Sequence, residues 1–305
     1  MLCETEFRIH KHSKQELGNE KLKHSKQELG NENLESEKLG EWTMIRALRT
    51  ASLGMFAQSL KLDNIANNLA NISTTGFKKS SIEFQDLFYQ TLRPAGVTDQ
   101  LNTELPTELQ IGHGNRPIGT VKNFMQGNVA RTDNTLDVAL EGDGFFQIQK
   151  PDGTLAYTRD GNFRLSSDGQ IVNVVGLILE PGIAVPQEAL QINIGVDGTV
   201  SAIVSGATEP EELGQIELAK FINAGGLKNI GGNLFAATAA SGDAILGTPG
   251  GEGFGQLLQG YLEESNVDVV KEMVDMIVAQ RAFETNSKAI RTAEQMMEVA
   301  SNLKR

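Results

Sequence analysis

Two seven-residue apolar repeats lie near the two ends of the chain. The first comprises Leu48, Met55, Leu62 and Leu69, and the second comprises Met276, Phe283, Ile290 and Met297. A spacing of seven places side chains on one face of a helix, where they need an apolar partner. The pattern therefore predicts two long terminal helices that pair as a coiled coil, within one subunit, between subunits, or both.

Local signals set the expected limits of these helices. The first covers 45–72 and ends in an Asn-rich stretch, because Asn is a weak helix former, and Gly76 then allows a turn. The second begins with Ser265 as its N-cap and Asp268 three residues later, and continues to about 303. Gln280, Ser287 and Glu294 interrupt its seam with polar groups, which cost stability and can fix register.

The chain between the helices has a different texture. Aromatic residues within 80–90 predict a short continuing helix, and 91–118, with little periodicity and three prolines, predicts an extended excursion. From about 120 the apolar runs are short, and Asp-Gly pairs occur at 152, 160, 168 and 197. Asp-Gly between short apolar runs is the strongest local signal for a hairpin. The expected fold is mainly β, with an antiparallel β domain inserted between the terminal helices.

This pattern gives a complete division of the chain. We expect a polar extension at 1–43, the N-terminal helix and turn at 44–79, an extended excursion at 80–119, the β domain at 120–240, a Gly-rich return linker at 241–264, and the C-terminal helix at 265–305.

The first 43 residues differ from the rest of the chain. They hold Cys3, Trp42 and three of the four histidines, and the segments 11–22 and 23–34 are a tandem repeat that matches at 11 of 12 positions. The segment is polar with few apolar residues, so we expect disorder or a loose helix. Its His residues lack the spacing of a metal site, which favours a solvated tail. Met44 is a candidate translation start.

Composition excludes several classes of function. The 305 residues include 27 Lys and Arg and 39 Asp and Glu, a net charge of −12, which argues against non-specific nucleic-acid binding. No apolar run reaches the roughly 18 residues of a membrane span, and the first 30 residues lack the apolar core of a secretory signal. We therefore expect a soluble protein that is not exported by the signal-peptide route.

Few residues indicate catalysis or ligand binding. Residues 247–255 are Gly-rich but lack the Lys-Ser/Thr ending of a phosphate loop, and the Asp-Gly pairs lack a calcium-site pattern. His113 is the only His after residue 43, and no Cys follows Cys3. The sequence therefore argues against a Ser-His-Asp or Cys-His catalytic site. Counting alone does not exclude a carboxylate pair. We predict no catalytic residue, cofactor, metal or small-molecule substrate.

Four segments carry a resemblance to a known family. Residues 66–79 read ANNLANISTTGFKK, followed by GDGFF at 142–146, YTRDGNF at 157–163 and GYLEESNV at 260–267. Together they resemble the bacterial flagellar rod and hook family, and the resemblance covers 44–305 but not 1–43. The family-signature positions are Asn67, Asn68, Leu69, Asn71, Thr75, Gly76, Phe77 and Lys78. The opening MIRAL, the long excursion and the block from 213 to 235 are most similar to the distal-rod branch.

The resemblance implies an axial structural protein rather than an enzyme. Such subunits leave the cytoplasm through the flagellar type III export gate without a cleaved signal, and polymerise into a rigid hollow rod across the periplasm that transmits torque to the hook. Their terminal helices form a coiled-coil core and the β domain an outer tube, with 91–118 bracing neighbouring subunits. The implied partners are further copies in a helical polymer, proximal rod proteins, the hook protein, the basal-body rings and the export apparatus. A proximal rod or hook subunit, and a periplasmic cell-wall hydrolase, are the alternatives.

Overall fold

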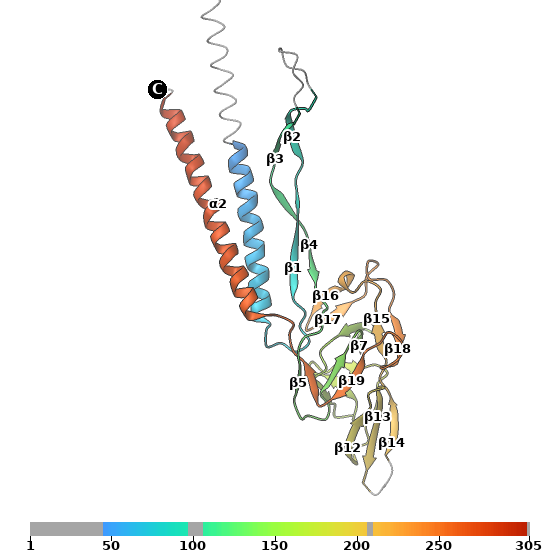
Figure 1. Cartoon of the computed structure of the whole chain (residues 1–305). Coiled ribbons are helices and arrows are strands. Elements are labelled where there is room, and N and C mark those ends of the chain that lie inside the picture. Colours follow the sequence, from blue (N-terminus) through green and yellow to red (C-terminus); the bar gives the residue numbers. More distant parts are fainter. Residues whose placement is uncertain (1–44, 97–105, 206–209, 304–305) are drawn as a thin grey trace, which may run out of the picture. The chain divides into compact units, whose positions relative to one another are not determined.

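Two long helices and a series of short antiparallel strands make up the chain. The computed structural model describes residues 45–96, 106–205 and 210–303 (Figure 1). The predicted disorder of 1–43, the position of Met44 and the centre of the excursion, 97–105, lie outside the described residues. The mainly β fold with a helix near each end confirms the predicted fold class.

The helices lie where the apolar repeats predict them. The N-terminal helix is described over 45–70, and α2 covers Val269–Leu303. Asp268, not Ser265, caps α2: its Oδ1 accepts hydrogen bonds from the backbone N–H of Val270 (2.9 Å) and Lys271 (3.2 Å). Ser265 Oγ instead accepts from Val267 N at 3.4 Å, before the helix begins. The prediction placed the cap one turn too early, because the local sequence offers two acceptable capping residues.

A narrow ribbon of strands follows the N-terminal helix. It consists of β1 (Ser80–Asp86), β2 (Tyr89–Arg93), β3 (Leu109–Gly112) and β4 (Asn115–Lys122), with β1 paired to β4 and β2 to β3. The short helix predicted at 80–90 is wrong. Ile82 and Phe84 are half-buried while Glu83 and Gln85 are exposed, and this period of two is typical of a strand.

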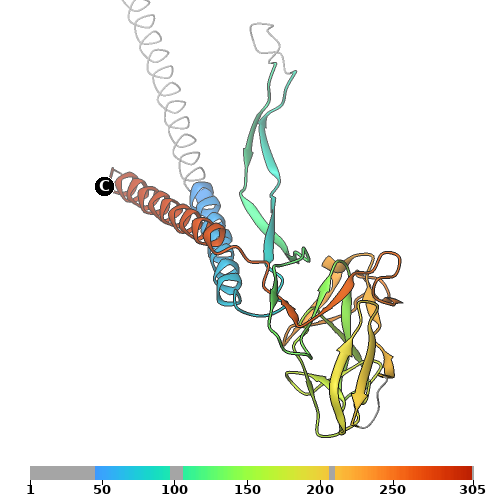
Figure 2. The same ribbon diagram turned by 60° about the horizontal axis from the view of Figure 1, so that its bottom comes forward.

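The chain divides into two compact units. One contains the described residues 45–57, 85–116 and 282–303, and in it Arg46 Nη1 donates a hydrogen bond to Gln90 Oε1 (3.2 Å), which ties the ribbon to the helix. The other contains 58–84 and 117–281 and includes the β domain. Figure 2 shows the strands of this domain from a second direction.

The β domain is built from short strands joined by turns. They are β5 (Val129–Arg131), β6 (Val138–Glu141), β7 (Phe145–Gln149), β8 (Leu155–Thr158), β9 (Phe163–Leu165), β10 (Ile171–Asn173), β11 (Ile178–Leu179), β12 (Ala189–Ile194), β13 (Thr199–Val204), β14 (Glu211–Gln215), β15 (Leu218–Lys220), β16 (Lys228–Gly231), β17 (Leu234–Ala236), β18 (Ile245–Gly247), β19 (Gln256–Gln259) and β20 (Tyr261–Glu263). A short 3-10 helix, η1, covers Ala224–Gly226.

The strands form one large sheet and several small ones. The large sheet has the order β16-β17-β8-β7-β11-β10-β9, and β15 joins it by pairing with β7 and β18. A second sheet has the order β12-β13-β14, while β19 pairs with β6 and β20 with β5. The segment 241–264, predicted to be a linker, therefore contributes three strands. Its glycines mark the turns between those strands rather than a flexible connection.

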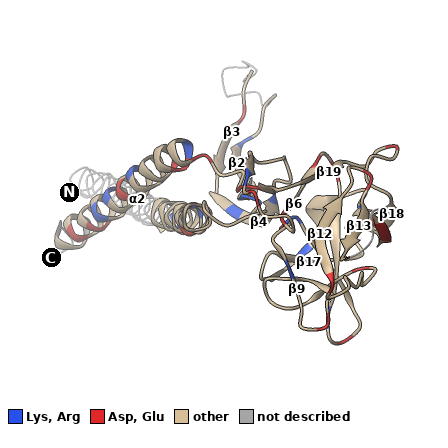
Figure 3. Cartoon of the chain, turned by 90° about the horizontal axis from the view of Figure 1, so that it is seen from below, with Lys and Arg blue, Asp and Glu red and all other residues tan. Residues whose placement is uncertain are grey.

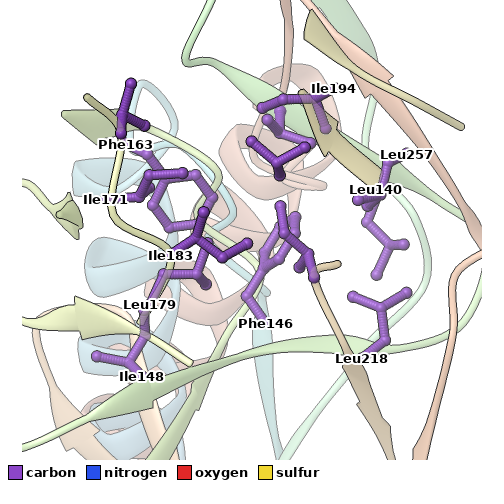
Figure 4. Packing of buried hydrophobic residues seen from close by; sticks show 14 of the residues in the cluster. Leu140, Phe146, Ile148, Phe163, Ile171, Leu179, Ile183, Ile194, Leu218 and Leu257 are labelled. Atoms are coloured by element: carbon purple, nitrogen blue, oxygen red, sulfur yellow. The ribbon is translucent and has the colours of Figure 1, made fainter. Parts of the chain in front are cut away.

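Alternation along β7 separates two apolar clusters. Phe146 and Ile148 point into the larger cluster with Leu140, Leu218 and residues of eight other strands, and are fully buried (Figure 4). Phe145 belongs to a second, aromatic cluster, in which edge-to-face ring pairs include Phe145–Phe221 at 5.8 Å. Because neighbouring residues of a strand point to opposite faces, β7 contributes to both clusters.

Of the Asp-Gly pairs at 152, 160, 168 and 197, three form the predicted hairpins. Those at 152, 168 and 197 connect β7 to β8, β9 to β10 and β12 to β13, all antiparallel pairs. The pair Asp160-Gly161 does not, because β8 and β9 have different partners. Gly161 instead allows close approach of two backbones: a Cβ there would lie 1.7 Å from the carbonyl oxygen of Val138.

Candidate functional site: the helix seams and the polar junction

The predicted seam residues lie along the two helices in partly covered positions. Leu48, Met55, Leu62, Leu69, Met276, Ile290 and Met297 are half-buried, and Phe283 is 38% exposed. Coiled-coil pairing through these residues remains a prediction.

A different row of residues makes the contacts between the helices that the structure identifies. A Cβ built on Gly54 would lie 2.9 Å from Asn286 Nδ2, and Asn68 Nδ2 donates a hydrogen bond to Glu272 Oε2 (3.3 Å). On α2 this row continues through Ala279 and Ala293, both buried. We call Gly54, Asn68, Glu272, Ala279, Asn286 and Ala293 the contact row. On the N-terminal helix it lies one residue before Met55 and Leu69.

The contact row corrects the expected positions of polar seam residues. Gln280 and Glu294 are exposed and Ser287 is half-buried, whereas Glu272 and Asn286 face the N-terminal helix. A helical seam alternates steps of four and three residues, so it passes from Met276 to Ala279, not to Gln280. The seam positions three residues after Met276, Phe283 and Ile290 are therefore Ala279, Asn286 and Ala293, of which Asn286 is polar.

A second face of α2 leaves apolar side chains uncovered. Val270, Met273, Val274, Ile277 and Val278 are each more than half exposed. Their spacing of three and four residues places them on neighbouring rows of one helix face. Charged residues of both signs lie along the same helix (Figure 3). Within the part of the chain that the structure describes, no helix is long and apolar enough to cross a membrane.

The family-signature positions differ sharply in burial. Asn67 is exposed, Leu69, Asn71 and Thr75 are half-buried, and Asn68, Gly76, Phe77 and Lys78 are buried. The buried ones meet residues from distant segments. We define the polar junction as Asn68, Lys78, Ser80, Arg159, Glu263 and Glu272, all in one compact unit.

Asn68 connects the N-terminal helix, β1 and α2. Its Oδ1 accepts a hydrogen bond from Ser80 N (3.0 Å), and its Nδ2 donates to Ser80 O (2.9 Å) and Glu272 Oε2 (3.3 Å). Asn64 supports the arrangement by donating from Nδ2 to the same Ser80 carbonyl (2.7 Å). The Asn68 amide is only 1% exposed, and its bonds satisfy it as burial requires.

Glu263 is the acceptor at the centre of the junction. Its carboxylate lies 2.6 Å from Lys78 Nζ and 3.5 Å from Arg159 Nη1, and all three side chains are almost fully buried. Gly127 N donates to the same carboxylate (2.8 Å), and Lys78 Nζ also donates to the carbonyl of Met125 (2.7 Å). One carboxylate thus faces two buried cations, so its removal would leave both without a counter-ion.

Burial dominates the electrostatics of the two cations. It lowers the pKa of Lys78, and the opposing effect of Glu263, by charge and hydrogen bond, is smaller. Burial likewise lowers the pKa of Arg159, whose guanidinium lies 5.4 Å from the centre of the Phe145 ring. Arg159 therefore links the junction to the aromatic cluster of the β domain.

Gly76 allows the chain to pass closely over the β domain. Its φ is +64°, and a Cβ there would lie 2.6 Å from Asp160 N. Next to it, Thr75 Oγ1 donates a hydrogen bond to Asp160 Oδ1 (2.9 Å), and Lys122 Nζ lies 4.3 Å from the Phe77 ring centre. The signature thus supplies a glycine where two backbones meet, with a hydroxyl donor before it and an aromatic ring after it.

Sequence reasoning missed the partners of the signature. Glu263 lies 185 residues from Lys78, Glu272 lies 204 residues from Asn68, and Arg159 lies 104 residues from Glu263, so no local periodicity connects them. The motif YTRDGNF contains Arg159 and GYLEESNV contains Glu263, so their place in these two motifs was the available signal. In the described residues, no group of three or more His, Cys, Asp or Glu is placed to hold a metal.

Three family models match separate parts of the chain. "Flagella basal body rod protein" matches residues 48–78, "Flagellar hook protein FlgE/F/G D1 domain" 139–202, and "Flagellar basal body rod FlgEFG protein C-terminal" 258–303. They include the N-terminal helix with its signature, the central strands, and the last strand with α2. Fold and matches together define the class: an axial protein of the flagellar rod and hook.

Similar proteins narrow that class. The flagellar basal-body rod protein FlgG of Borreliella burgdorferi is 52% identical over 264 residues, 86% of this chain and 100% of that protein. FlgG of Buchnera aphidicola from Schizaphis graminum is 48% identical (85% of this chain, 100% of that protein). FlgG of Bacillus subtilis is 41% identical (86% and 100%). The chain belongs to the FlgG family of flagellar basal-body rod proteins, and its place is the flagellar basal body.

A hook protein is more distant. FlgE of Brucella suis is 23% identical over 405 aligned residues, 85% of this chain and 98% of that protein. The difference in identity favours the rod over the hook.

Proposed function

We propose that this chain is a structural subunit that polymerises into the distal rod of the flagellar basal body, and that the exposed face of α2 is one of its assembly surfaces. The supporting observation is the row of uncovered apolar side chains formed by Val270, Met273, Val274, Ile277 and Val278. Contiguous exposed apolar surface of this kind marks an interaction site on a soluble protein. Because the family forms flagellar rods, we expect further copies of the same chain to bind this face.

The energetics support association through this face. Full burial of one Val, Ile or Met side chain contributes roughly 1.5–3 kcal/mol, and these five lie on adjacent turns, where one partner helix reaches all of them. Charged residues of both signs also lie along α2 (Figure 3), and charges beside an apolar face allow register-specific contacts between subunits.

The other parts of the chain take complementary roles in this proposal. The ribbon of β1 to β4 braces neighbouring subunits, since Phe88, Leu92 and Leu109 on it are exposed. The β domain forms the outer wall, and the subunit contacts the proximal rod, the hook, the surrounding rings and, during export, the export apparatus. The resulting shaft transmits motor torque to the hook, and the chain takes no part in catalysis.

One substitution tests the assembly surface directly. Ile277→Asp places a charge at the centre of the exposed face, and burying that charge in an interface is strongly unfavourable. Cells carrying it should lack complete rods and fail to swim. Gln280→Asp, on the same helix at an exposed polar position, is the matched control and should assemble.

Basal bodies are counted by electron microscopy, and an epitope label on the chain locates it along the rod. Normal rods in the Ile277→Asp strain would contradict the assembly surface. Label in the proximal rod or the hook would replace the distal-rod proposal by one of those positions.

A further inference from the structure

An apolar repeat of seven residues does not by itself fix how two helices are aligned. If one helix slides past the other by seven residues, every apolar row meets an equivalent apolar row again. The four residues of each predicted seam are all apolar, so they tolerate such a slip. Something other than the apolar repeat must therefore select one alignment.

The contact row contains two special contacts, and their spacing defines an alignment. Gly54 meets Asn286, and Asn68 meets Glu272. Gly54 and Asn68 are 14 residues apart, and so are Glu272 and Asn286, in the opposite order along the chain. Both contacts therefore belong to one antiparallel register, in which Lys61 lies opposite Ala279.

Each contact penalises a slipped register. Asn68 and Glu272 are buried at 1% and 5% exposure, so a slip would leave a buried amide and a buried carboxylate without each other. At the other contact, Gly54 leaves room for the Asn286 side chain, because a Cβ at position 54 would lie 2.9 Å from its amide nitrogen and would make that side chain move. Slipping would place a larger side chain opposite Asn286.

Asn68 is held in place independently of α2. Its bonds to the N–H and carbonyl of Ser80 fix the amide relative to β1, so only one of its donor hydrogens is available for Glu272. Asn68 thus presents a fixed hydrogen-bond donor to α2. Asn67, its neighbour of the same type, is exposed and shares none of these contacts in the described residues.

We infer that Asn68, through Glu272, is the positioning residue that sets the register of the two terminal helices, with Gly54 and Asn286 as a second reference point two heptads away. This inference goes beyond polymerisation: it concerns how one chain aligns its own ends. It needs the helix contacts and does not depend on which part of the flagellum contains the protein.

Paired cysteines test the register. In a Cys3→Ser background, Lys61→Cys with Ala279→Cys places two thiols at opposed positions, close enough for a disulfide only in the inferred register. Lys61→Cys with Ala293→Cys, two heptads away, is the mismatched control. The full-length chain is oxidised both as purified subunit and in isolated basal bodies, and linked peptides are identified by mass spectrometry. Mixing isotopically labelled and unlabelled chains separates links within a chain from links between chains.

The expected result is an intrachain 61–279 link and little 61–293 link. A dominant 61–293 link, or no 61–279 link in either preparation, would overturn the inferred register. Loss of rods in cells with an intact 61–279 link would instead count against the proposed function and leave the register supported.

Substitutions at the contact then test the role of Asn68. Asn68→Leu in the 61–279 background should lower the yield of the link about fivefold, the factor expected for one lost hydrogen bond, while Asn67→Leu should leave it unchanged. Glu272→Leu should lower the yield similarly without disturbing the Asn68–Ser80 bonds, and Glu272→Gln, which keeps an acceptor, should restore it. An unchanged yield in both Leu variants would refute the role of the contact, even if the register itself were correct.

Discussion

The β domain and the terminal helices solve the burial of apolar residues in different ways. In the β domain, Phe146 and Leu218 are fully buried by other strands of the same chain. On α2, Val270 is 72% exposed, and the contacts with the N-terminal helix include the polar residues Glu272 and Asn286. The core of the β domain is therefore formed within one chain, whereas α2 has an apolar face left for contacts beyond it. The comparison separates what stabilises the subunit from what is available for assembly.

The largest expected difference comes from truncating one apolar side chain to alanine in each of the two regions. Phe146→Ala in the β core should lower the free energy of unfolding by about 3–5 kcal/mol, because it leaves a cavity among closely packed side chains. Val270→Ala on α2 should change it by less than about 0.5 kcal/mol, as is usual for exposed positions. Urea unfolding of both variants, followed by circular dichroism, measures the difference. Equal destabilisation would remove the distinction between the two regions.

A somewhat smaller effect is expected at the junction between them. Glu263→Gln leaves Lys78 and Arg159 buried without a counter-ion, which should cost about 3 kcal/mol. Glu264→Gln is the matched control, since the neighbouring carboxylate is exposed. The comparison uses the same unfolding measurement, and a similar stability of the two variants would show that the junction contributes little.

The smallest expected effect lies at the start of α2. Asp268→Ala removes the acceptor for two backbone N–H groups and should destabilise the helix by about 1 kcal/mol. Ser265→Ala should have a smaller effect on helix content, because the Ser265 bond lies outside the helix. Helix content measured by circular dichroism during mild urea titration distinguishes the two. A larger effect of Ser265→Ala would restore the cap that the sequence pattern favours.

The sequence predicts the periodic elements well and the contacts between distant segments poorly. The apolar repeats locate both helices, and Asp-Gly pairs locate three hairpins, because these signals arise within a few residues. The aromatic residues at 80–90 were misread as a helix, since Ile82 and Phe84 show the strand period over only a few positions. Short apolar segments carry this ambiguity wherever tertiary pairing decides the outcome.

The candidate site shows the same division. The signature residues Asn68 and Lys78 could be selected from the sequence, but their partners Glu272 and Glu263 could not, because 204 and 185 residues separate them. The sequence also did not show whether the helices meet through the predicted apolar seam or through the contact row. Gly54 and Asn286 acquire their importance only when the two helices approach each other.

The two segments that connect the helices to the β domain have a mechanical consequence. They are bonded to each other: Gly76 N donates to the Glu263 carbonyl (2.8 Å), and Lys79 N donates to Asn266 Oδ1 (2.8 Å). Two segments without such bonds would twist about each other freely, whereas hydrogen bonds between the segments resist that twisting. Twisting one connecting segment relative to the other would therefore require both of these hydrogen bonds to break.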